Sequence, residues 1–336
     1  MPGESGIDVG TGRLRERDAS IAGAGFGISV GHATDVAGAT GCTVIRGTDG
    51  PLRASAFAFG RATGTRESAL LEPWASNDRI DAVLLTGGSA YGLDAAAGVM
   101  RWMEERGRGY AIAGGVVPIV PAAVVFDLAP LGAFTARPTA DMAYDACDRA
   151  TPSGWEEGSV GAGTGCTVGK LYGPKFAMKG GVGVGVAGTD LMACAVTVVN
   201  AVGHVRGMDG TIIAGPRHPT RGLVDSELEG SMHGFFGSPA ENTTISLVAL
   251  NHSFSKVELH RIARAASAAH ARRIGPAGTS YDGDVVFAVA PSDRPAGDPV
   301  RAEIVATKAL EEAIVRAVML AKGRDGVPGR LDSATE

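Results

Sequence analysis

An Asn-Thr-Thr triplet at positions 242–244 carries the most specific chemistry in the sequence. It stands between a polar, irregular segment at 216–239 and the apolar run TTISLVAL at 243–250. A threonine hydroxyl lies next to the carbonyl of the preceding residue, and in a strained backbone it can attack that carbonyl in an N-to-O acyl shift. Hydrolysis of the ester would free the α-amine of Thr243. Because the pKa of a free α-amine is ~7.7–8, this amine can act as general base for the hydroxyl of the same residue. The triplet therefore predicts self-cleavage between Asn242 and Thr243 with Thr243 as nucleophile, although an asparagine in a turn before a strand fits the same residues.

Two glycine-rich motifs resemble nucleotide-binding loops without meeting their requirements. Residues 183–188 (GVGVAG) match the dinucleotide fingerprint, but that fingerprint needs a strand before it and a helix after it. Strand-like, β-branched residues follow here, so we interpret the motif as part of a glycine-rich hairpin. Gly169 and Lys170 resemble the end of a phosphate loop, but Thr164 and Leu171 occupy positions that require Gly and Ser or Thr. A nucleotide-binding module is kept as an alternative that binding of NAD or ATP would reveal.

The sequence predicts no metal site and no cofactor. The seven histidines show no H-E-x-x-H or similar ligand spacing, which is what a zinc site would require. Four scattered cysteines without a C-x-x-C pair are typical of small buried thiols in a reducing compartment. No serine stands in a G-x-S-x-G elbow. The stretch 87–92 (GGSAYG) is read as a strand-to-helix turn whose backbone N–H groups could face an anion.

Composition indicates an ordinary globular protein of 336 residues, 45% hydrophobic and 20% charged, with a formal net charge of −5. Because no basic run occurs, neither nucleic acid nor an anionic membrane is an expected partner. There is no long apolar stretch for a membrane span and no signal-peptide core, so we expect a cytoplasmic protein. Residues 1–20 are expected to form a flexible N-terminal lead-in.

Hydrophobic periodicity predicts the elements that must position these residues. Strands are expected at 25–30, 42–46, 54–60, 81–85, 192–199, 243–250 and 284–290. Helices are expected at 93–106, 139–150, 255–273 and 302–322. Turn-rich, glycine-rich and mobile connecting segments are expected at 31–41, 158–169 and 216–239. The apolar run 114–127 contains Pro118 and Pro121, which argue against a central strand.

A larger set of motifs, in order over about residues 20–325, resembles one known family. These motifs are 30–35 (VGHATD), 40–44 (TGCTV), 64–67 (GTRE), 85–93 (LTGGSAYGL), 114–127 (GGVVPIVPAAVVFD), 161–165 (GAGTG), 200–203 (NAVG), 242–244 (NTT) and 282–284 (DGD). The set resembles the L-aminopeptidase/D-Ala-esterase-amidase family, which also contains the β-peptidyl aminopeptidases and the endo-type nylon-oligomer (6-aminohexanoate oligomer) hydrolases.

The resemblance implies an α/β fold, a four-layer αββα sandwich similar to N-terminal-nucleophile hydrolases but with different connectivity. It implies one hydrolase domain over 21–336, autocleaved into an α chain (1–242) and a β chain (243–336) that stay associated. It also implies a homo-oligomer of αβ units, with a tetramer favoured.

The resemblance further implies roles for individual residues. Thr243 corresponds to the nucleophile and Asn200 to an oxyanion-stabilising side chain. Lys170 lies where nylon-oligomer hydrolases have a lysine near the nucleophile. Asp282 and Asp284 lie where acidic or hydroxyl groups orient the nucleophile and its amine.

The same resemblance places Tyr91, with Gly88 and Ser89, in the motif that lines the substrate pocket. Taken alone, Lys170 reads as a surface lysine and Asn200 as a turn residue at the end of a strand. Only their joint fit to the pattern indicates a site.

These observations predict a cofactor-free aminopeptidase or amidase that cleaves short peptides or amino-acid amides through an acyl-Thr243 intermediate. Endo-cleavage of 6-aminohexanoate oligomers is the alternative, because the residues at the site positions also match the nylon-oligomer hydrolases. A related ornithine acetyltransferase type also self-cleaves before a threonine, but the motifs above fit it poorly.

Overall fold

The computed structural model describes residues 7–8, 13–14, 25–233 and 242–332. Within the lead-in predicted at 1–20, the described residues form the short antiparallel pair β1 (Ile7–Asp8) and β2 (Arg13–Leu14). The other residues of that segment lie outside the described part of the chain, as do residues 234–239 of the predicted connector.

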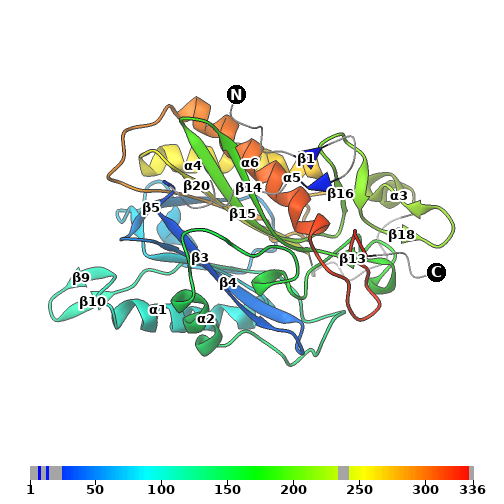
Figure 1. Ribbon diagram of the computed structural model, residues 1–336, viewed down its shortest axis with the longest axis horizontal. Coiled ribbons are helices and arrows are strands. Elements are labelled where there is room, and N and C mark those ends of the chain that lie inside the picture. The colour runs from blue at the N-terminus through cyan, green and yellow to red at the C-terminus, as the bar shows by residue number, and fades with distance from the viewer. Residues whose placement is uncertain (1–6, 9–12, 15–24, 234–241, 333–336) are drawn as a thin grey trace.

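Two β-sheets stacked face to face form the centre of the fold (Figure 1). The first has five strands, in the order β3 (Ile28–Asp35), β4 (Thr40–Gly47), β8 (Ala82–Thr86), β11 (Ala122–Val124) and β6 (Thr65–Arg66). The second has six, in the order β14 (Gly181–Gly188), β15 (Met192–Asn200), β20 (Thr243–Leu250), β22 (Val285–Ala290), β5 (Leu52–Ala58) and β7 (Arg79–Ile80). Pairing is antiparallel except between β8 and β11 and between β20 and β22.

Helices cover the outer face of each sheet (Figure 1). The first sheet packs against α1 (Ala96–Glu104) and α2 (Ala140–Asp148). The second packs against α4 (Lys256–Ala266), α5 (Ala268–Arg273) and α6 (Pro299–Met319). Alternate residues of each strand face either the helices or the opposite sheet; in β20, for example, Val248 faces the helices and Leu247 the inter-sheet core. The four-layer αββα sandwich expected from the resemblance is therefore confirmed.

Glycines in β14 allow α6 to pack directly on the sheet. An ideal Cβ added at Gly183 would lie 2.0 Å from the carbonyl oxygen of Ala313, and one at Gly185 would lie 1.9 Å from that of Ala309. β14 forms a hairpin with β15, so the hairpin interpretation of residues 183–188 is confirmed. Their glycines serve close helix–sheet packing here.

The remaining elements are short. The strands are β9 (Tyr110–Ile112), β10 (Gly115–Val117), β12 (Thr167–Val168), β13 (Met178–Lys179), β16 (His204–Arg206), β17 (Ile212–Ala214), β18 (Arg217–His218), β19 (Gly222–Leu223) and β21 (Ile274–Gly275). The helices are α3 (Ser226–His233) and four 3₁₀ turns, η1 (Ser68–Leu71), η2 (Ser89–Ala95), η3 (Gly161–Gly163) and η4 (Pro174–Phe176).

Three sequence expectations are corrected. Residues 31–35, expected to be a turn, continue β3, and Gly31 is needed because an added Cβ would lie 2.0 Å from the carbonyl oxygen of Ala146 in α2. The expected irregular connector contains α3. The run 114–127 does contribute an interior strand, β11, which begins just after Pro121; the carbonyl of Pro121 already accepts from the N–H of Leu84.

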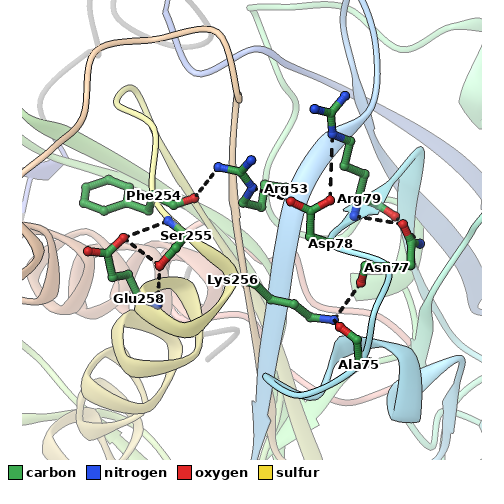
Figure 2. A network of polar contacts seen from close by, with 9 residues as sticks. All are labelled: Arg53, Ala75, Asn77, Asp78, Arg79, Phe254, Ser255, Lys256 and Glu258. Carbon is green, nitrogen blue, oxygen red and sulfur yellow. Dashed lines mark hydrogen bonds and ion pairs between the residues drawn. The ribbon is translucent and has the colours of Figure 1, made fainter.

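A polar network joins the N-terminal end of α4 to the segment before β7 (Figure 2). Lys256 Nζ donates to the carbonyl oxygens of Leu70, Ala75 and Asn77 at 2.7, 3.1 and 2.7 Å. Ser255 and Glu258 form a capping box that fixes the start of α4. Two segments far apart in sequence are thus held together by a buried ammonium group. Among the described residues, no helix is long and apolar enough to cross a membrane.

Candidate active site

The predicted nucleophile lies at one end of the six-stranded sheet. Thr243 is the first residue of β20 and pairs with Asn200, the last residue of β15. On the other side of β20, Asn242 forms a parallel bridge with Asp282, two residues before Asp284. Lys170 reaches the same place from the loop after β12. The structure therefore brings all the predicted catalytic residues together from four separate segments.

The peptide bond between Asn242 and Thr243 is buried, with the two residues 3% and 7% exposed. Thr243 Oγ1 donates to the carbonyl oxygen of Asn242 at 2.5 Å. The N–H of Gly283 donates to the same oxygen at 3.1 Å. The hydroxyl and the carbonyl that self-cleavage would join are therefore in direct contact.

Lys170 links the two asparagines of the site. Its Nζ donates to Asn200 Oδ1 at 3.0 Å, to the Asn200 carbonyl oxygen at 3.1 Å and to Asn242 Oδ1 at 3.2 Å. Only 8% of Lys170 is exposed, so the surface-lysine interpretation does not describe it. The buried ammonium thus lies beside the Asn242–Thr243 peptide, and its charge opposes the rise in the pKa of Asp282 that burial causes.

The side-chain amide of Asn200 has a defined orientation. Its Oδ1 accepts from the N–H of Thr167 at 3.0 Å as well as from Lys170. Its Nδ2 donates to the carbonyl oxygen of Phe126 at 2.9 Å. Since the backbone N–H and the ammonium can only donate, the oxygen must face them and the NH₂ group must face Phe126.

Asp282 and Asp284 are both buried and bind backbone N–H groups. Asp284 accepts from the N–H of Thr244 at 2.6 Å and from that of Gly278 at 3.0 Å. Asp282 accepts from the N–H of Thr279 at 2.7 Å. Burial raises the pKa of both carboxyls, and the charge of Asp282 raises the pKa of Asp284 further. In the uncut chain, Asp284 thus fixes the backbone of β20 one residue after Thr243.

The structure also contains a cleft of about 1030 Å³. Its lining comprises Thr65, Arg66, Glu67, Ala90, Tyr91, Leu93, Asp94, Thr135, Arg137, Pro138, Thr139 and Ala140. Tyr91, predicted to line the substrate pocket, lines this cleft, and the guanidinium of Arg137 lies 3.5 Å from the centre of its ring. Gly88 and Ser89 do not line the cleft. They form the turn before Tyr91, with φ of 82° and 52°.

Two backbone connections relate the cleft to the nucleophile. The N–H of Ala62 donates to the carbonyl oxygen of Asp282 at 3.0 Å, and Thr65 of the cleft follows three residues later, at most ~11 Å along the chain. On the other side, the carbonyl of Phe126 binds Asn200, and the next residue, Asp127, binds the turn at Gly88. Chain segments close in sequence to the cleft residues are thus hydrogen-bonded to Asp282 and Asn200.

Asp127 has a positioning role that the sequence reasoning missed. It is 2% exposed, and its carboxylate accepts from the N–H of Gly88 at 2.6 Å and from Thr40 Oγ1 at 2.7 Å. Burial raises the pKa of Asp127 to about 6. The available signal was an acidic residue at the end of the apolar run 114–127. Asp127 holds the left-handed turn that presents Tyr91.

Lys179 is a second residue that sequence reasoning missed. It is 1% exposed, and its Nζ donates to the carbonyl oxygens of Thr164 and Cys166 at 2.9 and 2.7 Å. Burial lowers the pKa of Lys179 to about 8. It fixes the glycine-rich turn that precedes Thr167, whose N–H binds Asn200. No sequence signal distinguishes it from an ordinary lysine.

One group of possible metal ligands occurs among the described residues, formed by His204, Asp225 and Glu227. Its geometry does not suit a cation. His204 Nδ1 accepts from the N–H of Ser226 at 2.9 Å, so in the neutral ring Nε2 carries the proton and neither nitrogen is available as a ligand. Arg206 also pairs with Asp225 at 2.7 Å.

Comparison with known proteins places this chain in a family. The sequence profile of Peptidase family S58 matches residues 26–331. An uncharacterized aminopeptidase of Mycobacterium leprae is 41% identical over 301 residues, which cover 85% of this chain and 76% of the relative. A 6-aminohexanoate-oligomer endohydrolase of Agromyces sp. is 31% identical over 273 residues, which cover 78% of this chain and 72% of the relative.

The fold also matches a solved structure. The L-aminopeptidase D-Ala-esterase/amidase of Ochrobactrum anthropi, described as a new variant of the Ntn hydrolase fold, superposes with a TM-score of 0.65. The match covers 90% of this chain and 87% of that one at 19% sequence identity. The chain therefore belongs to Peptidase family S58 and is an amide-bond hydrolase with an Ntn-hydrolase-like fold.

Proposed function

We propose that this hydrolase activates itself by cutting its own chain between Asn242 and Thr243, and that Thr243 is then its nucleophile. The observation that carries the proposal is the 2.5 Å contact between Thr243 Oγ1 and the carbonyl oxygen of Asn242, on a buried peptide. Groups already in contact need little further movement to react. Cleavage yields an α-amine on the same residue as the hydroxyl, so general base and nucleophile come from Thr243 alone.

The surrounding side chains suit turnover after cleavage. The NH₂ group of Asn200 can stabilise the oxyanion that forms when Thr243 attacks a substrate carbonyl. The ammonium of Lys170 favours the neutral form of a neighbouring amine, whereas ionised Asp282 and Asp284 favour the charged form. The balance between them sets the pH at which the amine becomes an active base.

Contacts across the proposed cut support continued association of the two chains. β20 is hydrogen-bonded to β15, and β22 is hydrogen-bonded to β5, so in each pair one strand lies before the cut and the other after it. Lys256 and Phe254, after the cut, bind residues before it: Lys256 binds the carbonyl groups near β7, and the carbonyl oxygen of Phe254 accepts from Arg53 at 3.1 Å (Figure 2). Cleavage removes none of these contacts.

We propose short peptides and amino-acid amides as substrates, with release of the N-terminal residue. The M. leprae relative at 41% identity is named an aminopeptidase, and the cleft offers the exposed carboxylates of Glu67 and Asp94 for a substrate ammonium group. The second candidate is endo-cleavage of 6-aminohexanoate oligomers, which the relative at 31% identity favours.

Selective chemistry on the new N-terminus tests the mechanism. Mild periodate oxidises an N-terminal threonine that has both a free amine and its neighbouring hydroxyl, and leaves internal threonines intact. We expect activity to fall in parallel with oxidation of Thr243, while a chelator has no effect. Full activity after complete oxidation, or loss with chelator that a divalent metal restores, would contradict this mechanism.

Parallel assays distinguish the two substrate classes. The protein is incubated with amino-acid amides, β-peptides and 6-aminohexanoate oligomers, and the products are identified by mass spectrometry. Stepwise release of single N-terminal residues supports the aminopeptidase. Internal fragments of the oligomers as the main products would favour the endo-hydrolase.

A further inference from the structure

The carbonyl oxygen of Asn242 has a backbone donor directed at it from the neighbouring segment. The N–H of Gly283 donates to it at 3.1 Å. The parallel bridge between Asn242 and Asp282 aligns the two segments, so that the next N–H along the chain, that of Gly283, points at the carbonyl that would be attacked. In self-cleavage this oxygen becomes the oxyanion.

Gly283 also leaves room that any other residue would fill. An ideal Cβ at this position would lie 2.8 Å from Thr243 Oγ1, 3.2 Å from Thr243 Cγ2 and 2.8 Å from the carbonyl oxygen of Ala62. Its φ is outside the left-handed region, so the backbone conformation does not itself require glycine. Glycine is needed here because any side chain would occupy the space around the Thr243 hydroxyl.

We propose that Gly283 is a catalytic residue of self-cleavage: its N–H stabilises the oxyanion on Asn242, and its bare α-carbon leaves the Thr243 hydroxyl room to reach the carbonyl carbon. This inference rests on the proposed self-cleavage and adds its oxyanion donor. Thr243 Oγ1 forms a bond to the Asn242 carbonyl carbon, the bond from that carbon to the Thr243 nitrogen breaks, and the hydroxyl proton ends on that nitrogen. Water then hydrolyses the ester to the Asn242 carboxylate and the Thr243 hydroxyl.

The proposal separates the donors of the two reactions. Gly283 contacts the carbonyl of Asn242, the group attacked in self-cleavage. Asn200 Nδ2 donates to the carbonyl oxygen of Phe126. We assign Gly283 to the chain's own carbonyl, whereas Asn200 is the donor proposed above for the carbonyl of the substrate.

The first test compares the cleavage rates of freshly synthesised chains on a denaturing gel. Gly283→Ala should slow cleavage about 100-fold or more, the scale expected when an oxyanion donor and its geometry are disturbed. Gly50→Ala is the matched control, because an added Cβ there meets nothing within 4 Å.

A double variant tests the space argument separately. The effect of Gly283→Ala on the cleavage rate should be smaller in a Thr243→Ser chain, since serine lacks the Cγ2 atom that would crowd the new Cβ. Unchanged cleavage in a folded Gly283→Ala chain would overturn the space argument.

A backbone ester tests the N–H without adding an atom. Replacing residue 283 by glycolic acid, through suppression with an α-hydroxy acid, removes the donor and also weakens the Asp282 carbonyl, which accepts from the N–H of Ala62. An Ala62 ester, which removes that N–H, is the control for the second effect, and an ester at residue 50 is the general control. With the ester at 283, cleavage should slow about 10²–10³-fold. An ester at 283 that cleaves at the wild-type rate would overturn the assignment, whether or not Gly283→Ala folds. If wild-type protein is itself never cut, the proposed function fails; if wild type is cut and the ester is equally fast, only this inference fails.

Discussion

Asn200 and Thr243 face each other directly across neighbouring strands, because the last residue of β15 is paired with the first residue of β20. Antiparallel sheet geometry puts the Cα atoms of such a pair about 4.5–5.5 Å apart. The proposed oxyanion donor and nucleophile are thus positioned by the ladder of the six-stranded sheet. Side-chain substitutions at either residue leave the backbone hydrogen bonds in place, so they test chemistry more than folding.

Substitution of Thr243 should affect processing and turnover together. Thr243→Ala removes the hydroxyl that both reactions need and should give one uncut, inactive chain. Thr243→Ser keeps a hydroxyl and should still cut, more slowly. Thr244→Ala, at the next buried position, is the matched control and should be cut normally. Gel mobility and hydrolysis rate are measured together, and hydrolysis by the Thr243→Ala chain would mean that another residue is the nucleophile.

Asn200 should matter chiefly for turnover. Asn200→Ala and Asn200→Asp should each lower the turnover of processed enzyme about 10²–10³-fold, the usual scale for one oxyanion donor. The Ala variant should also lose about 1–3 kcal/mol of stability, measured by denaturant unfolding, because it leaves the N–H of Thr167 and the Lys170 ammonium without the Oδ1 acceptor. The Asp variant keeps that acceptor but turns a carboxylate oxygen toward the carbonyl of Phe126, so it too should lose stability. Near-normal turnover in a processed Asn200→Asp enzyme would remove Asn200 from the catalytic residues.

Asp284 should make the uncut chain less stable as the pH rises. Burial and Asp282 raise the pKa of Asp284 in the folded state, whereas an unfolded Asp titrates near ~3.9. Below that pH the carboxyl is protonated in both states, so it does not lower the stability of the folded chain. Above it the carboxyl ionises in the unfolded chain but stays protonated in the folded one. The free energy of unfolding therefore falls as the pH rises, until the folded pKa is passed.

The test uses the Thr243→Ala chain with and without Asp284→Asn, which does not titrate. Thermal unfolding between pH 4 and 8, across the window about the two pKa values, should show the Asn variant gaining stability relative to its parent as the pH rises. Asp293 is exposed, so Asp293→Asn is the control, and its thermal stability should depend on pH as that of the parent chain does. A pH-independent difference between the Asp284→Asn variant and its parent would show that the carboxyl is not destabilised by burial.

Asp127 should act on substrate binding through the turn at Gly88. Asp127→Ala leaves the N–H of Gly88 without its acceptor, which should cost about 1–3 kcal/mol and raise KM more than it lowers kcat. Asp127→Asn keeps one acceptor oxygen and should recover part of the KM effect. Thr40→Val, which removes only the hydroxyl partner, is the milder control. A fall in kcat with an unchanged KM in the Asp127→Ala enzyme would contradict a positioning role at the cleft.

Periodicity identified the strands and helices that carry the site. β20 begins and ends where the apolar run 243–250 does, and β15 and β22 lie within one residue of their expected bounds. The error at 31–35 arose because Gly31 resembles a turn residue, whereas it is required by close contact with α2. Contacts between distant segments of this kind are not visible in a local pattern.

The same limit applies to the site. Lys170 and Asn200 could be named from the sequence only through the resemblance to a known family, and the structure brings them to Thr243. Gly283 and Asp127 could not be assigned roles from the sequence. Gly283 acts through its backbone N–H and through the space that its lack of a side chain leaves. Asp127 acts by holding the backbone turn at Gly88. The role of Gly283 depends on the register between β20 and the segment before β22, and that of Asp127 on its contact with the distant turn at Gly88, and only the fold supplies either.

The most direct test follows a freshly synthesised chain over time by intact mass, N-terminal sequencing and hydrolysis rate. We predict that the 336-residue chain is converted into two pieces, that the smaller begins Thr-Thr-Ile-Ser, and that hydrolytic activity rises in proportion to that piece. A fully active preparation that contains only the intact chain, or a new N-terminus at any residue other than Thr243, would contradict the account.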